Sequence, residues 1–246
     1  MGDPELRPLR LSFGRVAYTY HSVRPPYFQP LLDRAQAALE LEASARVLDL
    51  AAGTGRLTHE LARRFAHVTA VEPDDDMRAL ISDGDVLAGT AEAIPLDDGS
   101  VDAVFVGEAF HWFDARAAIG EIVRVLRPRG GLALVHTHWW ETEPPLPEGA
   151  IELLREPYER FAEQRNPPWD EAFAGSPFEA LHRERFEEEM TVDVDTLLDL
   201  YSTTSSLAAL PHEERAALFA AVRGHLSGPY RLPIRHELTW TRRAAP

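Results

Sequence analysis

The stretch that decides the fold is Val47-Leu48-Asp49-Leu50-Ala51-Ala52-Gly53-Thr54-Gly55-Arg56-Leu57-Thr58. An apolar run that meets two closely spaced glycines predicts a buried strand, a tight turn and the start of a helix. A second apolar run follows and ends on Glu72. Its spacing from Gly55 is close to the roughly 20 residues that separate a glycine turn from a ribose-binding acid. Because glycines let the backbone approach a ligand and the acid accepts ribose hydrogen bonds, this unit favours an adenosine-type ligand.

Composition narrows the possible chemistry. The chain has 246 residues, of which 45% are hydrophobic and 26% charged, as expected for a soluble globular protein with one α/β domain and some additions. It contains no cysteine, which excludes disulfides, thiolate metal sites and cysteine nucleophiles. All 25 basic residues are arginine, which excludes lysine Schiff bases and the lysine of a phosphate-binding P-loop.

The charge balance indicates which partners to expect. The net charge of −15 repels nucleic-acid phosphates and anionic lipid, so we expect no nucleic acid and no membrane partner. The first ten residues carry no apolar core of the signal-peptide type, and no apolar run reaches 18 residues. We therefore expect a cytoplasmic protein, either a monomer or a homodimer.

Apolar and amphipathic segments alternate between residues 46 and 138, which predicts a parallel sheet with helices on both faces. Right-handed crossovers place all the carboxyl ends of the strands, and hence a ligand, at one edge. The predicted fold is α/β and Rossmann-like, a doubly wound, mostly parallel seven-stranded sheet with a helical cap. The expected strands are 46–51, 67–72, 85–89, 101–106 and 131–138, and the expected helices are 56–66, 74–82 and 114–127.

We predict a single domain over residues 1–246, with additions on both sides of this core. Residues 11–44 form an N-terminal cap, an irregular aromatic-rich piece that breaks at Arg24-Pro25-Pro26 before a helix from Leu31 to Leu39. Residues 45–139 form the cofactor-binding core. Residues 140–230 are expected to cover the ligand edge and to add late sheet elements, before a final strand at 231–243. The expected late elements are a helix at 148–164, a strand at 183–194 and helices near 195–208 and 211–226.

Five ordered segments resemble the class I S-adenosylmethionine-dependent methyltransferases, in particular their type 11 small-molecule branch. One subgroup shares the segment around Phe110-His111-Trp112-Phe113, and Tyr20-His21-Ser22-Val23-Arg24-Pro25 matches its Tyr-x-x-x-Arg-Pro pattern. The resemblance extends over residues 13–138, and the last hundred residues are similar to the family only in layout. The five segments are residues 48–55, 71–77, 89–104, 108–114 and 121–131.

The resemblance implies that S-adenosylmethionine binds at the carboxyl edge of the first, second and fourth strands and leaves as S-adenosylhomocysteine. Gly53 and Gly55 would cradle its methionine end, Asp49 would take its amino group, and Glu72 would bind its ribose. Residues 91–93 would meet the adenine. The cofactor-binding residues implied are Asp49, Gly53, Thr54, Gly55, Glu72, Pro73, Met77, Ala91, Glu92, Ala93, Glu108 and Phe110.

In this family the loop after the fourth strand faces the transferring methyl group, which makes His111 a candidate general base. The alternative is that His111 only shapes the pocket or hydrogen-bonds the substrate. Methyl transfer is an in-line displacement that proximity and alignment accelerate, so a base is not obligatory. Arg24 would pair with a carboxylate, and aromatic side chains would wall the pocket and stabilise the sulfonium. The expected substrate-binding residues are Tyr20, Arg24, Trp112, Trp139 and Trp140.

Several alternatives stay open at the level of the sequence. A dinucleotide oxidoreductase is disfavoured, because no third glycine follows Gly53 and Gly55 at the spacing of the Gly-x-Gly-x-x-Gly pattern. A non-catalytic adenosyl-ligand-binding protein, or one that uses the sulfonium for ring closure, would keep the same motifs. His136 and His138 share a strand face and form a possible metal pair, although we expect no metal. The small-molecule acceptor offers a carboxylate, a hydroxyl, a nitrogen or an activated carbon, and the sequence does not select among them.

Overall fold

The computed structural model describes residues 17–138, 145–161 and 169–245. The chain divides into two compact units that combine segments far apart in the sequence. The first unit contains the described parts of residues 1–25, 138–165 and 187–235. The second contains those of 26–137, 166–186 and 236–246. The expected single domain with a cap over the ligand edge stays a prediction.

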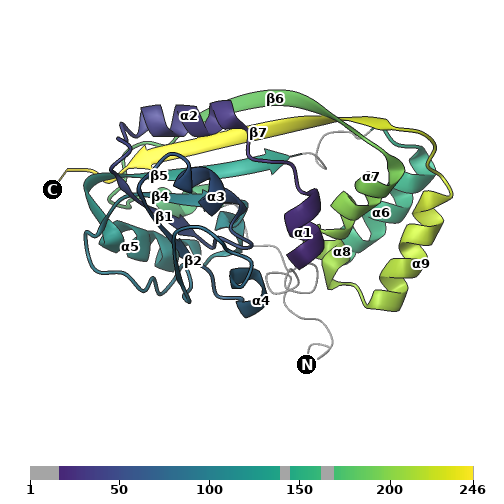
Figure 1. Cartoon of the computed structure of the whole chain (residues 1–246), viewed down its shortest axis with the longest axis horizontal. Coiled ribbons are helices and arrows are strands. Elements are labelled where there is room, and N and C mark those ends of the chain that lie inside the picture. The colour runs from purple at the N-terminus through teal and green to yellow at the C-terminus, as the bar shows by residue number, and fades with distance from the viewer. Residues whose placement is uncertain (1–16, 139–144, 162–168, 246) are drawn as a thin grey trace. The chain divides into compact units, whose positions relative to one another are not determined.

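A seven-stranded sheet is the central element, which confirms the predicted fold class. β1 pairs in parallel with β2 and β4, and two further parallel pairs join β2 to β3 and β4 to β5. Figure 1 shows β7 pointing opposite to β5, so the sheet is mixed but mostly parallel. In sheet order the strands are β3 (Asp85–Leu87), β2 (His67–Val71), β1 (Arg46–Leu50), β4 (Val101–Gly107), β5 (Leu126–His138), β7 (Tyr230–Arg242) and β6 (His182–Val192).

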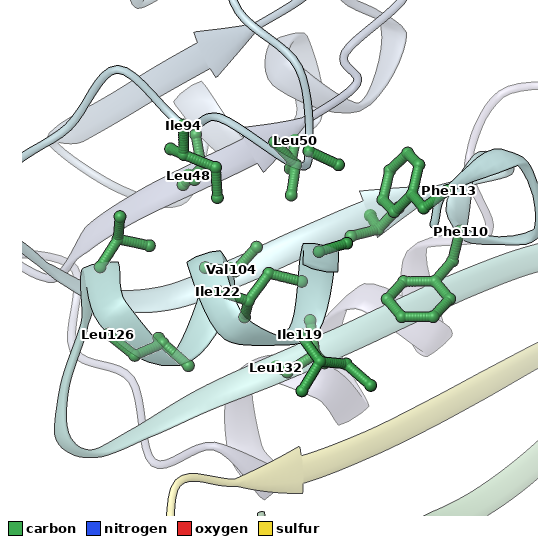
Figure 2. Packing of buried hydrophobic residues seen from close by; sticks show 14 of the residues in the cluster. Leu48, Leu50, Ile94, Val104, Phe110, Phe113, Ile119, Ile122, Leu126 and Leu132 are labelled. Carbon is green, nitrogen blue, oxygen red and sulfur yellow. The ribbon is translucent and has the colours of Figure 1, made fainter. Parts of the chain in front are cut away.

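Helix α5 (Ala115–Val125) covers one face of this sheet in the second unit. Its apolar residues recur at helical spacing, and Asp114 begins the helix by accepting a hydrogen bond from the Ala117 amide at 3.2 Å. Ile119 and Ile122 pack with Val104 of β4 in a buried cluster that Figure 2 shows in close view. This face also carries the short helices η3 (Phe110–Trp112) and η5 (Asp170–Phe173).

The opposite face is covered by α2 (Gln29–Ala38) and α3 (Arg56–Ala62). Leu31 and Leu57 from these helices pack with Val47 of β1 and Phe105 of β4. Because side chains alternate along a strand, Asp49 shares this face with Val47. The register places Asp49 directly beside Phe105, so its carboxyl lies on the α3 face of the sheet near the end of β1.

The first unit is mostly helical. It contains α1 (Ala17–Val23), α6 (Glu148–Arg160), α7 (Val194–Ser202), α8 (Ser205–Ala209) and α9 (His212–Arg223). Ala150, Leu198 and Val222 form its buried centre, where α6, α7 and α9 meet. The helices expected in the last hundred residues are therefore present.

Three expectations about helices and strands were wrong in detail. The aromatic-rich piece before Arg24 contains a helix, α1, rather than irregular chain. The helix expected at 195–208 is two helices, because the hydroxyls of Thr203 and Thr204 donate to the carbonyls of Leu200 and Tyr201 and compete with helix hydrogen bonds. β5 begins at Leu126 rather than at 131, and the register shift within the β4–β5 pairing accommodates the extra residues.

Helix α4 (Asp75–Arg78) is also shorter than the helix expected at 74–82. Asp74 caps it, accepting from the amides of Asp76 and Met77 at 2.9 and 3.0 Å. The chain then closes tight turns with three-residue spacing and does not continue the helix. This turn brings Ile81 against Gly55, where a β-carbon on the glycine would lie 2.9 Å from the Ile81 side chain.

Candidate functional site

The glycine loop between β1 and α3 makes the tight turn that the sequence predicts, with positive φ angles at its glycines. Gly53 and Gly55 have φ angles of 57° and 80°, and Gly55 begins α3. Ala51 also has a positive φ, 58°, which costs a residue with a side chain on the order of 1–2 kcal/mol. Such strain persists where the surroundings fix the backbone, and it is typical of ligand-binding loops.

Glu72 at the end of β2 holds this loop in place. Its Oε2 accepts from the Gly53 amide at 2.8 Å and its Oε1 from the Asp74 amide at 2.9 Å. The carboxyl is buried, and this burial raises its pKa, while the two amides act in the opposite direction. Each carboxylate oxygen has a second lone pair, so the group still has acceptor capacity for a diol.

Asp49 is the most unusual ionisable group near the loop. It is buried, and its Oδ2 accepts from the Thr58 hydroxyl at 2.6 Å. Burial raises the pKa of Asp49 to about 7, and the charge of Glu72 adds to the shift. Among the residues that the structure describes, its Oδ1 has no hydrogen-bond partner, and neither does the buried hydroxyl of Thr54 in the loop itself.

These two orphaned atoms test whether the loop fits the amino-acid end of S-adenosylmethionine. Buried polar atoms in folded proteins are nearly always hydrogen-bonded, so two such atoms with no partner among the described residues offer hydrogen-bonding capacity to a polar ligand at this loop. An ammonium group would satisfy Asp49 and stabilise its charged form, and a carboxylate would accept from Thr54. The residues present therefore fit such a ligand.

The other expected cofactor residues surround this loop or follow β3. Met77 is buried beside Gly53, Pro73 is exposed, Ala91 is buried and Ala93 is exposed. Glu92 accepts from the Asp114 amide at 3.0 Å, so it joins its loop to the start of α5. The same loop is fixed further along by Arg124, which donates to the carbonyls of Ile94 and Leu96. Their contacts with an adenine remain a prediction.

The loop after β4 carries the expected catalytic residue. Glu108 has a positive φ of 59°, and the chain then enters η3. His111 is exposed, and its ring lies 4.6 Å from that of Trp112 and 6.2 Å from that of His136 on β5. An imidazole can exchange a proton at neutral pH, and the role of His111 as a general base remains a prediction.

Beside this loop lies an aromatic cluster that the sequence did not predict. Phe110 is fully buried, and its ring lies 5.3 Å from Trp169 and 5.7 Å from Phe173. Trp169 also lies 6.3 Å from His136. Phe110 thus belongs to a packed cluster, and its contact with a cofactor remains a prediction. The only sequence signal was two aromatics, Trp169 and Phe173, at helical spacing after the consecutive prolines 167 and 168 of the sequence.

The expected substrate-binding residues lie in different parts of the chain. Trp112 is half-buried against the cluster around Phe110. In the first unit, Arg24 donates to the Thr203 hydroxyl at 2.9 Å and to its carbonyl at 2.8 Å, and stacks on Tyr20 at 4.8 Å. Arg24 therefore joins α1 to the α7–α8 junction, and its pairing with a substrate carboxylate remains a prediction. Trp139 and Trp140 lie outside the described residues.

Two features are absent from the residues that the structure describes, a metal-binding cluster and a helix that could span a membrane. Within residues 17–138, 145–161 and 169–245, no group of three His, Asp or Glu side chains is arranged to hold a metal ion. In the same segments, no helix has both the length and the apolar character that crossing a membrane requires.

The sheet order and the glycine-loop site define a class I methyltransferase fold, and sequence relatives agree. The family model described as a methyltransferase domain, type 11, matches residues 48–134. An uncharacterized methyltransferase of Mycobacterium tuberculosis is 38% identical over 221 residues, 88% of this chain and 86% of the relative. The chain therefore belongs to the type 11 branch of the class I S-adenosylmethionine-dependent methyltransferases.

Two further similarities refine this assignment. A malonyl-[acyl-carrier protein] O-methyltransferase of Methylococcus capsulatus is 35% identical over 154 residues, 53% of this chain and 51% of that protein. A solved structure, described as a candidate type II methyltransferase from Anaeromyxobacter dehalogenans, aligns with a TM-score of 0.60 and 25% identity. It covers 91% of this chain and 99% of its own length, so the likeness includes the late elements as well as the motif region.

Proposed function

We propose that this protein transfers a methyl group from S-adenosylmethionine to a small-molecule acceptor. The observation that carries the proposal is the buried, unpaired Asp49 oxygen beside the glycine loop, together with Glu72 at the next strand end. A carboxyl in this position is costly unless a cation meets it. The ammonium group of an S-adenosyl amino acid meets that need, whereas NAD has no primary ammonium group to offer.

The residues around the loop have separable roles in this proposal. Glu72 binds the ribose hydroxyls while it holds Gly53, and the backbone of the glycine loop receives the amino-acid end together with Asp49 and Thr54. When bound, S-adenosylmethionine supplies an electrophilic methyl group on a sulfonium. The exposed His111 takes the proton of an acidic acceptor, and the neighbouring aromatic side chains exclude water and orient the acceptor.

The acceptor class is proposed from charge and from one relative. The net charge of −15 supports a small molecule rather than nucleic acid or a membrane surface, and the same balance supports a cytoplasmic monomer or homodimer. The Methylococcus capsulatus relative is named for O-methylation of a malonyl group on acyl-carrier protein. Free and thioester-linked carboxylates are therefore the first acceptors to screen, followed by hydroxyls, nitrogens and activated carbons.

A ligand panel followed by a transfer assay tests the proposal. Thermal unfolding is measured in the presence of S-adenosylmethionine, S-adenosylhomocysteine or NAD. Each ligand is added at a concentration well above a micromolar dissociation constant. Both adenosyl-sulfur ligands should raise the unfolding temperature by several degrees, and NAD should not. Methyl-labelled donor is then incubated with the acceptor panel. Stabilisation by NAD alone would overturn the proposal, and binding without transfer to any acceptor would favour a non-catalytic binding protein.

A further inference from the structure

Tyr27, which the sequence motifs did not assign, lies at the carboxyl end of β4. A β-carbon built on Gly107, the last residue of β4, overlaps the Tyr27 hydroxyl oxygen and lies 3.0 Å from its Cζ. The same β-carbon lies 3.1 Å from the side chain of Leu57, in the first turn of α3. The phenol therefore fits between α3 and the end of β4 only because residue 107 has no side chain.

The phenol shares a sheet face with the unpaired carboxyl of Asp49. Asp49 pairs with Phe105, and both residues are on the α3 side of the sheet. Gly107 is two residues beyond Phe105, so it faces the same side and lies closer to the ligand edge. The Tyr27 hydroxyl therefore lies about two residues of β4 closer to the carboxyl edge of the sheet than Asp49 does. It is near Leu57, at the start of α3, which follows the glycine loop.

The surrounding chain fixes Tyr27 in this place. The ring of the next residue, Phe28, stacks on His236 of β7 at 4.9 Å and contacts Phe186 of β6 at 5.8 Å. The Gln29 side chain donates to the Tyr27 carbonyl at 3.1 Å. Tyr27 itself is half-buried. A half-buried phenol packed against Gly107 and Leu57 has few side-chain conformations open to it, so it can bind a polar group with little loss of side-chain entropy.

We propose that the Tyr27 hydroxyl binds the amino-acid end of the methyl donor beside Asp49, and that residue 107 is glycine to admit this hydroxyl. The inference rests on the proposed function. A phenol donates one hydrogen bond and accepts others, so it suits a group that carries both an ammonium and a carboxylate. Asp49 meets the positive charge, and Tyr27 adds a bond that an adenosine without the amino-acid end cannot use.

The experiment compares a ligand that has the amino-acid end with one that lacks it. Binding is measured by calorimetry for S-adenosylhomocysteine and for 5′-methylthioadenosine, which keeps the adenosine and the thioether but lacks the amino-acid end. Tyr27→Phe should weaken binding of S-adenosylhomocysteine about tenfold or more, because a hydrogen bond to a charged group is lost. Binding of 5′-methylthioadenosine should change less than twofold. Glu72→Ala serves as the matched control and should weaken both ligands.

Gly107→Ala tests the second half of the proposal. In the wild-type background it should displace the phenol and reproduce the selective loss of S-adenosylhomocysteine. In the Tyr27→Phe background the same change should add no further selective loss, since the overlapping oxygen is already absent. Gly120→Ala is the matched glycine control, because Gly120 is exposed on α5 and a β-carbon there meets no atom of the described residues within 4 Å.

The possible results distinguish a failure of the proposed function from a failure of the proposed role of Tyr27. If wild-type protein binds neither adenosyl compound, the proposed function fails and this inference fails with it. If wild-type protein binds both, and Tyr27→Phe weakens both equally or neither, the proposed function stands and Tyr27 has no specific role. If Tyr27→Phe selectively weakens binding of S-adenosylhomocysteine but Gly107→Ala does not, the role of Tyr27 stands. Only the proposal that residue 107 must be glycine to admit the hydroxyl is then overturned.

Discussion

The glycine loop and the loop after β4 lie at the ends of neighbouring parallel strands, yet different forces hold them. The glycine loop is fixed by hydrogen bonds from backbone amides to Glu72, and within the described part of the chain buried polar atoms of Asp49 and Thr54 are unpaired. The loop after β4 is fixed by aromatic packing around Phe110. Unpaired polar atoms demand one particular partner, whereas packed rings with an exposed histidine accept many shapes. We infer that the first region selects the methyl donor and the second accommodates the acceptor.

The largest expected effect separates catalysis from donor binding. His111→Ala should lower kcat by about 10²–10⁴ with an acidic acceptor, because a positioned general base is lost. The affinity for S-adenosylhomocysteine should stay within twofold, since the change lies in the loop after β4. Single-turnover rates and calorimetry on the same preparation measure the two effects. An unchanged rate would show that alignment alone drives the transfer and would remove His111 from the mechanism.

A substitution at the glycine loop should weaken donor binding, in contrast to the expected loss of kcat in His111→Ala. Glu72→Ala removes the acceptor of the Gly53 and Asp74 amides and the proposed ribose ligand. Affinity for S-adenosylhomocysteine should fall about a hundredfold, since several hydrogen bonds to a charged group are lost. Glu213→Ala, an exposed acid in α9, serves as a control for the change in net charge. Wild-type affinity in Glu72→Ala would contradict the role of this region in donor selection.

Donor binding should also depend on pH through Asp49. The pKa of this carboxyl is about 7 in the ligand-free protein, and an ammonium partner favours the charged form. Binding should therefore release a proton below pH 7, and affinity should rise up to about tenfold per pH unit until it levels off above pH 7. Asp49→Asn should make the profile flat. Calorimetry between pH 5.5 and pH 8.5 would reveal a flat wild-type profile if this account is wrong.

The raised pKa of Asp49 also predicts how the stability of the ligand-free protein depends on pH. The folded pKa of Asp49 is above its ordinary value of 3.8, so the folded state holds this proton more tightly than the unfolded state. Asp49 therefore contributes stability that is present below pH 4 and is lost as pH rises through 7. Denaturant unfolding of wild type and Asp49→Asn across this window isolates the contribution.

The smallest effect concerns the backbone of the glycine loop. Ala51→Gly should stabilise the protein by about 1 kcal/mol or less, because relief of the positive φ exceeds the entropy cost of glycine. Gly55→Ala should destabilise it by more, since its φ is 80° and the new β-carbon would approach Ile81. Chemical denaturation measures both variants. Destabilisation by Ala51→Gly would indicate that the Ala51 methyl group packs usefully in this loop.

The sequence predicted local features better than long-range ones. β1, β2 and β4 were placed closely because buried parallel strands are continuous apolar runs, and Glu72 was found from its spacing to the loop. The break after α7 was missed, since it depends on two threonine hydroxyls that bond to the preceding turn. The Trp169 cluster has only the helical spacing of Trp169 and Phe173 as a local signal, and the meeting of Tyr27 with Gly107 has none. Both depend on tertiary packing, which a periodicity argument does not contain.

The most direct test of the central claim is a calorimetric titration of S-adenosylhomocysteine at pH 6.5 in two buffers with different ionisation enthalpies. Asp49 at the glycine loop should receive the ligand's ammonium group, so binding should be in the micromolar range and should release a substantial fraction of one proton. Asp49→Asn should abolish the release. Tight binding with no proton release, or no binding by a folded protein, would contradict the claim that this loop is built for the amino-acid end of the methyl donor.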